Sequence, residues 1–249
     1  TRGCSRTQND KRLERAAKKY VSLPRDASQG RTNRSEVIAV YIYDPVTLFD
    51  EKDALQRFGK LKVEATSFTI SEPIESMEVS TMLYDLATDE QKAILESVYD
   101  ISPFSVQTIT LERIFVDKLF AAEAYVRSAS IAHRAFEAAK HIYDLAVIIK
   151  HPKITALLTD EDKLGNLLRI RMEEEKERLD GIPDVRPSEF TFFTQTANNK
   201  AVRTAYTAMQ NQYVLRSCDR IDFQTANTAL AQIQRGLLNN SAWVEAGNK

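Results

Sequence analysis

Five long segments in the second part of the chain repeat apolar residues at intervals of three and four positions, which gathers them on one helix face. Pro152, the Gly181-Ile182-Pro183 turn and Pro187 interrupt this pattern and mark helix ends. The chain has only seven Gly and seven Pro in 249 residues, which also favours helix. We therefore predict helices over residues 111–128, 134–150, 159–179, 198–216 and 223–238.

The first part of the chain has a different pattern. One stretch is rich in β-branched and aromatic residues, and a later one alternates polar and apolar side chains, as a half-buried strand does. The predicted elements are a basic helix at 8–20 and strands at 36–43, 61–70 and 78–83. We predict an α+β fold, in which a mixed α/β unit over residues 1–104 precedes a mainly helical unit over residues 105–249.

Charge is distributed unevenly along the chain. Residues 1–36 hold ten Lys or Arg against four acids, a formal charge of +6, whereas the whole chain carries −1. A basic arm on an acidic body is suited to nucleic-acid or nucleotide phosphates. A solvated helix with a disordered flank is an equally good interpretation of this arm.

The chain lacks the sequence features of secreted and membrane proteins. Cys4 and Cys218 lie far apart, so a disulfide framework is not expected and a reducing cytoplasm fits. No segment approaches the roughly 18 apolar residues of a membrane span, and we find no signal peptide. We predict a cytoplasmic protein without membrane association.

Lys118 is the charged member of an otherwise apolar helix face. An ammonium group in such a place needs a counter-charge, a phosphate, or a route to water along its four-carbon stem. The functional interpretation is an anion-binding group, and the alternative is a Lys whose head reaches water at the edge of the core. The residues that share its stripe are Leu111, Phe115, Ala122 and Tyr125.

Asp144 lies in the next helical segment, one turn after Lys140. Taken alone, it is best interpreted as half of an exposed pair with Lys140, worth about 0.3–0.5 kcal/mol. The functional alternative is a carboxylate that acts as a general base or orients Lys118. The neighbouring His141 could carry a proton, although a lone helical His is more often structural. Zinc-ligand spacing is absent from the histidines, which are His133, His141 and His151.

Two further groups of acids could hold a metal. Glu64 lies on the polar face of a predicted strand, where it could bind Mg²⁺, although a solvent-facing Glu is the favoured interpretation. Asp160 and Asp162 form an Asp-x-Asp sequence, but they follow Thr159 at the start of a helix. Acids behind an N-capping Thr are what a helix dipole favours, so we predict a capping role.

Two other stretches are predicted to be structural. Residues 173–178 are all charged and indicate a solvated helix face. A set at helical spacing is predicted to pack between helices, namely Tyr206, Met209, Gln210 and Tyr213. The chain has no P-loop, Gly-x-Gly-x-x-Gly, Gly-x-Ser-x-Gly or His-Glu-x-x-His sequence, so the enzyme classes that depend on those motifs lack support.

Taken together, these segments resemble the AbiEii/AbiGii-type nucleotidyltransferase toxins. The resemblance covers roughly residues 5–240, and its most specific points are Lys118 and Asp144. It rests on matching segments in the same order, which are Leu-Lys-Val-Glu-Ala at 61–65, Leu-Glu-Arg-Ile-Phe-Val-Asp-Lys-Leu at 111–119, Ala-Lys-His-Ile-Tyr-Asp-Leu at 139–145, Ala-Tyr-Thr-Ala-Met at 205–209 and Asp-Phe-Gln-Thr-Ala at 222–226.

The resemblance implies a nucleotidyltransferase α/β core, a helical C-terminal part, and transfer of a nucleotide from an NTP with Mg²⁺. It also implies an RNA acceptor, tRNA in several members, and a cognate antitoxin protein in a toxin–antitoxin or phage-defence system that stops translation. By position, Lys118 would hold the triphosphate, Asp144 would be the essential acid, and Glu64 would bind metal. Arg113 and His141 would be further nucleotide-binding residues. The basic arm would bind RNA through Lys11, Arg12, Arg15, Lys18 and Lys19.

One family motif has no match in this sequence. The first motif of the family, a Gly-Ser or Gly-Gly turn followed by Asp-x-Asp, supplies the two main metal carboxylates, and we expect it upstream of Thr1. If the natural protein lacks that motif, the alternative is a degenerate member of the fold that binds a nucleotide or a protein and transfers nothing. A helical scaffold without a ligand is a third possibility.

Overall fold

The computed structural model describes residues 31–32, 36–42, 60–66, 72–128, 131–177, 181–214 and 216–247. The chain divides into two compact units, Thr1–Ile70 and Ser71–Lys249. The predicted basic helix at 8–20 lies outside the described residues, and so do the five basic residues assigned to RNA binding. The domain boundary expected near residue 105 falls inside a strand of the second unit.

The described part of the first unit is a three-stranded antiparallel sheet. Its order is β1 (Arg31–Thr32), β2 (Glu36–Ile42) and β3 (Lys60–Thr66). Both predicted strands are present over the described residues, with β2 buried from Val37 to Tyr41, whereas residue 43 and residues 67–70 lie outside them. In β3, Val63 and Ala65 are half-buried and Lys62 and Glu64 are exposed, as expected, but Leu61 is exposed too. Ile38 of β2 is the register partner of Glu64 on β3. The polar face of β3 carries an ion pair between Lys62 and Glu64, whose charged atoms are 2.8 Å apart.

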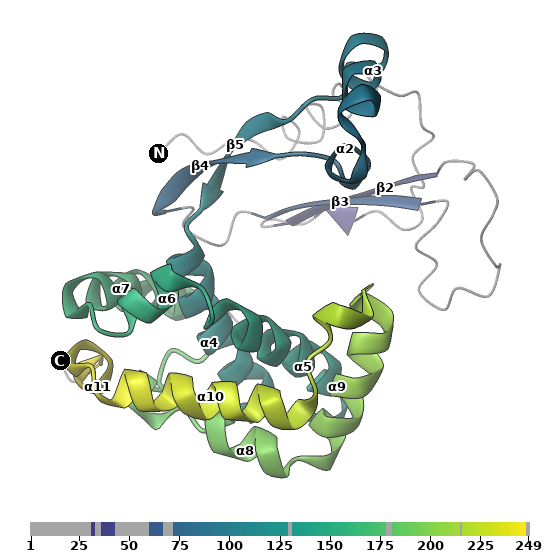
Figure 1. The fold of residues 1–249 in the computed structure, drawn as a ribbon. Coiled ribbons are helices and arrows are strands. Elements are labelled where there is room, and N and C mark those ends of the chain that lie inside the picture. Colours follow the sequence, from purple (N-terminus) through teal and green to yellow (C-terminus); the bar gives the residue numbers. More distant parts are fainter. Residues whose placement is uncertain are drawn as a thin grey trace. The chain divides into compact units, whose positions relative to one another are not determined.

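The second unit begins with an antiparallel pair, β4 (Ile74–Val79) and β5 (Phe104–Ile109), which is visible in Figure 1. Two helices lie between these strands in sequence, α2 (Met82–Leu86) and α3 (Asp89–Tyr99). The strand predicted at 78–83 is therefore wrong beyond Val79. The chain turns into helix there because the Thr81 hydroxyl accepts a hydrogen bond from the Tyr84 amide and caps α2.

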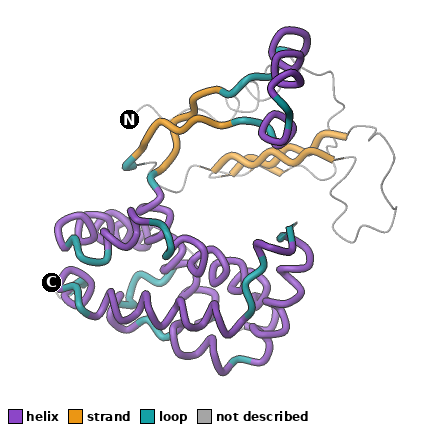
Figure 2. The backbone as a smooth tube through the Cα atoms, in the orientation of Figure 1, coloured by secondary structure: helices purple, strands orange, loops and turns teal. Residues whose placement is uncertain are grey.

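The rest of the second unit is helical, as Figure 2 shows by colour. Thr110 caps the first of these helices, Asn199 and Asp222 cap later ones, and each cap side chain accepts from an amide in the first turn. The five predicted long helices are confirmed to within a few residues. The elements are α4 (Leu111–Arg127), α5 (Ile131–Ile148), α6 (Pro152–Leu157), α7 (Glu161–Glu177), η1 (Pro187–Glu189), α8 (Phe192–Asn198), α9 (Lys200–Tyr213), η2 (Ser217–Asp219), α10 (Phe223–Leu238) and α11 (Ser241–Glu245).

Helix α5 lies at the centre of the helical part, where it packs against α4, α9 and α10. The predicted stripe on α4 faces this core, with Phe115 and Ala122 fully buried and Lys118 partly exposed. Several core side chains are completely enclosed, among them Leu119, Ile142, Leu145, Tyr206 and Trp243. Small antiparallel sheets followed by a helical region confirm the predicted α+β fold class.

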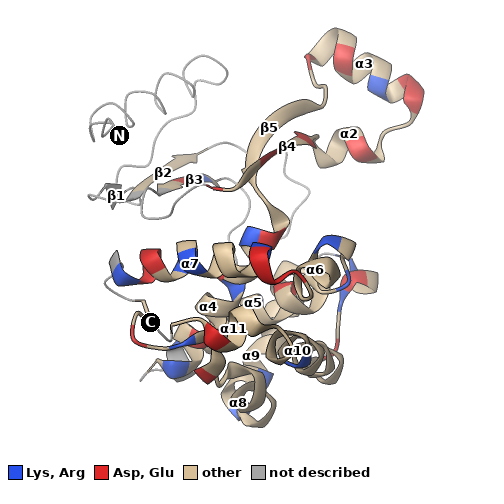
Figure 3. Cartoon of the chain, turned by 90° about the vertical axis from the view of Figure 1, so that its left-hand side faces the viewer, with Lys and Arg blue, Asp and Glu red and all other residues tan. Residues whose placement is uncertain are grey.

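Helix α7 confirms one prediction about charged residues and corrects another. Asp160 itself caps α7, because its carboxylate accepts from the Lys163 amide at 2.9 Å, while Thr159 bonds to the preceding turn. The capping role of the Asp-x-Asp sequence is thus confirmed, with the cap one residue later than expected. Figure 3 shows charges of both signs along α7, but residues 173–178 are not all solvated, since Glu174 and Glu175 are buried.

No helix among the described residues combines the length and the apolar character that a membrane crossing requires.

Candidate functional site

Lys118 and Asp144 form an ion pair across the interface between α4 and α5. The Lys118 ammonium donates a hydrogen bond to Asp144 Oδ2, and the two atoms are 2.6 Å apart. The pair is partly open to solvent, with side-chain exposures of 28% for Lys118 and 35% for Asp144. The predicted surface pair between Asp144 and Lys140 is wrong, because Lys140 bonds instead to Glu137 at 2.7 Å on its own helix.

The ion pair opens into a pocket of about 810 Å³. This volume lies within the range of about 300–1,000 Å³ that small-molecule sites occupy. Helix α5 supplies five of the lining residues and α2 supplies three, and the candidate residues Lys118, Asp144 and His141 all line this pocket. Its other lining residues are Met82, Asp85, Leu86, Glu137, Lys140, Tyr143, Met209, Tyr213, Val214, Arg216 and Asp219.

His141 lies beside the ion pair but is uncharged at neutral pH. Its ring stacks on Tyr125, with ring centroids 5.3 Å apart. Burial, followed by the charge of Lys118, lowers the pKa of His141 from 6.5 to about 4. Its Nδ1 atom is buried without a hydrogen-bond partner. A neutral imidazole can donate or accept a hydrogen bond, but it adds no positive charge for a phosphate.

The far end of the pocket is aromatic and carries a second ion pair. The Lys140 ammonium lies 5.3 Å from the ring centroid of Tyr213 and 5.8 Å from that of Phe136. Burial acts to lower the pKa of Lys140, but the hydrogen bond and charge of Glu137 outweigh it, so the pKa is raised and Lys140 stays charged. Tyr213 was predicted to pack between helices, yet it is 52% exposed, whereas Tyr206 and Met209 of the same stripe are buried.

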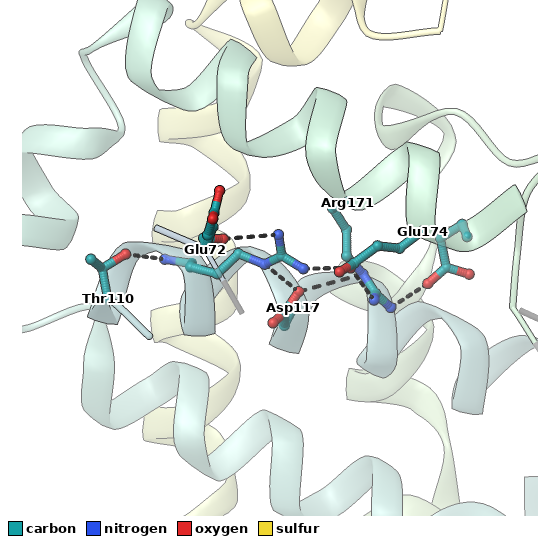
Figure 4. Close-up of polar contacts among 7 residues, drawn as sticks. Glu72, Thr110, Asp117, Arg171 and Glu174 are labelled. Atoms are coloured by element: carbon teal, nitrogen blue, oxygen red, sulfur yellow. Dashed lines mark hydrogen bonds and ion pairs between the residues drawn. The ribbon is translucent and has the colours of Figure 1, made fainter. Parts of the chain in front are cut away.

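Arg113 faces away from the solvent in a network of buried charges, shown in Figure 4. Its guanidinium donates to Asp117 at 3.0 Å, to the Glu72 carbonyl at 3.5 Å, and to the Glu174 carboxylate. Arg171 lies 3.3 Å from Glu174 and 3.6 Å from Asp117. The side chains of Arg113, Asp117, Arg171 and Glu174 together form the Arg113 network. The geometry gives Arg113 a clear structural role, because its side chain is 1% exposed.

Helix α4 also carries a buried carboxylate, Glu123, that the sequence analysis did not single out. Glu123 is fully enclosed and accepts from the amides of Thr191 and Phe192, both at 2.8 Å, and from the Thr191 hydroxyl at 3.1 Å. It also pairs with Arg127. Thr191 is the N-cap of α8 but makes no cap bond with its own side chain, so Glu123 supplies that cap from α4. No local pattern signals this role, because the two segments are 68 residues apart.

Glu64 belongs to the first unit. Its side chain is 49% exposed and is paired with Lys62. Within the part of the chain that the structure describes, no three His, Cys, Asp or Glu side chains come together to hold a metal ion.

A family model described as nucleotidyl transferase AbiEii toxin, type IV toxin–antitoxin system, matches residues 4–229, which is nearly the whole chain. The match spans Lys118, Asp144 and every segment on which the sequence resemblance rests. No curated protein and no solved structure shows significant similarity to the chain.

Proposed function

The chain belongs to the AbiEii family of nucleotidyl transferase toxins from type IV toxin–antitoxin systems, and we propose that it moves a nucleotide from an NTP to an RNA acceptor, tRNA. The observation that supports this proposal best is the Lys118–Asp144 ion pair at the mouth of a pocket of suitable volume. The Lys118 ammonium is partly exposed, so an incoming triphosphate can compete with Asp144 for it.

The reaction needs a positively charged group beside the leaving pyrophosphate, and it needs the acceptor hydroxyl held in line with the bond that breaks. An acceptor hydroxyl attacks the α-phosphorus, the bond to the bridging oxygen breaks, and pyrophosphate leaves with the electron pair. Lys118 neutralises negative charge on the β and γ phosphates as pyrophosphate forms. Asp144 either accepts the hydroxyl proton or, once the nucleotide is bound, holds the Lys118 ammonium in place.

The proposal includes dependence on Mg²⁺, with Glu64 as one carboxylate ligand. This rests on the family resemblance, whose Asp-x-Asp motif has no match in the printed sequence. The described residues contain no cluster of three or more His, Cys, Asp or Glu side chains that would hold the ion. Chelation by EDTA should abolish transfer, and restoration by Mg²⁺ should be lost in a Glu64→Ala variant.

The basic arm is proposed to hold the RNA, through the five residues Lys11, Arg12, Arg15, Lys18 and Lys19. Five such contacts give a slope of about −3.5 for log K against log salt with single-stranded RNA. Filter binding of tRNA across a salt series measures this slope. If the slope does not change when the five residues are replaced by Ser, the basic arm does not contact the RNA phosphates.

The family also places this protein in a system with an antitoxin. We extend that to a setting in the cytoplasm, where NTPs and tRNA are found, and to arrest of translation as a defence against phage. Expression of the protein alone should stop incorporation of labelled amino acids before it stops transcription, and co-expression of the antitoxin should reverse the arrest.

The direct test is label transfer with the full-length protein. Each α-³²P-NTP is mixed with Mg²⁺ and total tRNA, using wild type, Lys118→Ala and Asp144→Ala, and the exposed Lys150→Ala as the matched control. Loss of one charged contact to the transition state costs on the order of 10²–10³-fold in rate. We expect that loss in the first two variants and full activity in the control. No label on tRNA from folded wild-type protein would favour the degenerate, ligand-binding alternative.

A further inference from the structure

Four polar residues of α5 line the pocket along a single helix face. Glu137, Lys140, His141 and Asp144 follow the spacing i, i+3, i+4, i+7 and all belong to the pocket wall. At a rise of about 1.5 Å per residue, the first and last of them are about 10 Å apart along the helix. Along this face the pocket wall therefore carries two ion pairs, Lys118–Asp144 and Lys140–Glu137, and the parts of the pocket around them are called the Lys118 end and, after the nearby Tyr213, the Tyr213 end.

The second end presents an aromatic surface. Tyr213 is 52% exposed and lines the pocket, and its ring lies 5.7 Å from that of Phe136. Met209 and Val214 add buried apolar surface to the same wall. A half-exposed Tyr beside apolar side chains is a suitable platform for a flat aromatic ligand, because every nucleobase has a π-face that can stack on it.

The two ends also differ in the groups they offer to a ligand. The Lys118 end offers an ammonium that suits phosphate oxygens, next to a neutral His141. The Tyr213 end offers a ring face, with a charged donor on Lys140 and a charged acceptor on Glu137 close to it. Donors and acceptors at the edge of a stacked base are the means by which proteins distinguish one base from another.

We propose that the Tyr213 end of the pocket is the nucleobase subsite, in which the base stacks on Tyr213 and its edge meets the Lys140–Glu137 pair. This inference rests on the proposed binding of an NTP with its phosphates at Lys118. In this arrangement Tyr213 of α9, with Glu137 and Lys140 of α5, selects the nucleotide. The Lys118 end binds the phosphates of any NTP and does not distinguish the bases.

Calorimetric titration with two ligands separates the two ends. The ligands are the preferred NTP and inorganic tripolyphosphate, which has the phosphates but no base. Stacking on an aromatic side chain is worth about 1–3 kcal/mol. We therefore expect Tyr213→Leu to weaken NTP binding about 5- to 150-fold and to leave tripolyphosphate binding unchanged. Tyr213→Phe should restore NTP binding, since the ring is retained, and Lys118→Ala should weaken both ligands.

The outcomes distinguish this inference from the proposed function. Equal NTP affinity in wild type and Tyr213→Leu, with Lys118→Ala still defective, would overturn the base subsite and leave the proposed function standing. No binding of any NTP to folded wild-type protein would overturn both. Circular dichroism confirms folding, which the exposed position of Tyr213 leads us to expect in both variants.

A companion variant tests the edge contact. Glu137→Gln keeps the shape of the side chain but removes its charge. We expect the ranking of the four NTPs by affinity to change while the affinity for tripolyphosphate stays the same. An unchanged ranking would show that the Lys140–Glu137 pair does not meet the edge of the base.

Discussion

Asp117 and Lys118 are neighbours on α4, but they belong to two regions in which charge has different consequences. Asp117 points into the Arg113 network, where Arg113, Arg171 and Glu174 are all at most 3% exposed. Burial raises the pKa of Asp117 although Arg113 and Arg171 oppose this change. Lys118 points into the pocket, and both members of its pair keep about a third of their surface in water.

The difference teaches how to separate structural from functional charge in this protein. In the Arg113 network, Arg113, Arg171 and Glu174 are compensated by protein groups and shielded from solvent, and only Asp117 keeps a partly exposed side chain, at 25%. In the open pair, solvent screens the attraction and a ligand can replace one partner, so little stability depends on it. Substitutions in the first region should change stability, and those in the second should change activity.

The strongest test of this contrast is Arg113→Ala. Removing one partner of a buried ion pair leaves the remaining carboxylates uncompensated, which costs about 3–5 kcal/mol. We expect urea denaturation to show a loss of this size in the free energy of unfolding. A loss below 1 kcal/mol would mean that the network does not anchor α4, and Arg113 would return as a nucleotide-binding candidate.

A second test breaks a buried charge further along α4. Glu123→Gln replaces an acceptor of the Thr191 and Phe192 amides with a group that carries one acceptor and one donor. Hydrogen bonds to charged groups are worth about 1.5–3 kcal/mol, and we expect a destabilisation of about 2–3 kcal/mol. Hydrogen exchange at the start of α8 should rise in the variant, and exchange in α3 serves as the internal control.

A third test uses pH to probe the pocket side. The pKa of His141 is about 4 in the folded protein, against 6.5 in the unfolded chain, so the unfolded chain binds more protons between these values. Stability should therefore fall as pH drops from about 6.5 towards 4, with a loss of about 2 kcal/mol between pH 7 and pH 5 from this group. His141→Phe keeps the stacking on Tyr125 and should flatten the profile. An identical profile in the variant would assign the pH dependence elsewhere.

The smallest expected effect on stability completes the comparison. Lys118→Met should change the free energy of unfolding by at most about 1 kcal/mol, because the pair is partly solvated. The same variant should lose label transfer. Thermal unfolding followed by circular dichroism, with Lys150→Met beside it, measures the first quantity. A destabilisation as large as that of Arg113→Ala would erase the distinction between the two regions.

Local signals in the sequence predicted the long helices, and together with the family resemblance they singled out the Lys118–Asp144 candidate pair. The helix 223–238 was predicted with its bounds, because its apolar spacing is regular and Asp222 provides a clear N-cap. Lys118 stood out as a charge on an apolar stripe, and the resemblance joined it to Asp144. The short helices α6, α8 and α11 were not predicted, because five to seven residues are too few to show a period.

Contacts between distant segments could not be predicted from the sequence. Glu174 lies in a charged run and looked solvated, but it is buried because Arg113 meets it from 61 residues away. Likewise, the spacing of Tyr213 is that of a packing residue. Its ring is nevertheless exposed, because Tyr213 is the last residue of α9 and lines the pocket. In both cases tertiary structure decides the environment of a residue whose local pattern is ambiguous.

The bond between Glu123 and the start of α8 has a consequence for synthesis of the protein. Lys118 and Asp144 are 26 residues apart, whereas Glu123 finds its partners only at Thr191 and Phe192. During translation Lys118 and Asp144 can thus meet while Glu123 on the same helix still lacks the two amides that it binds in the complete protein. A nascent chain that stops before residue 191 would leave Glu123 with Arg127 alone as its partner, which disfavours a stably folded fragment.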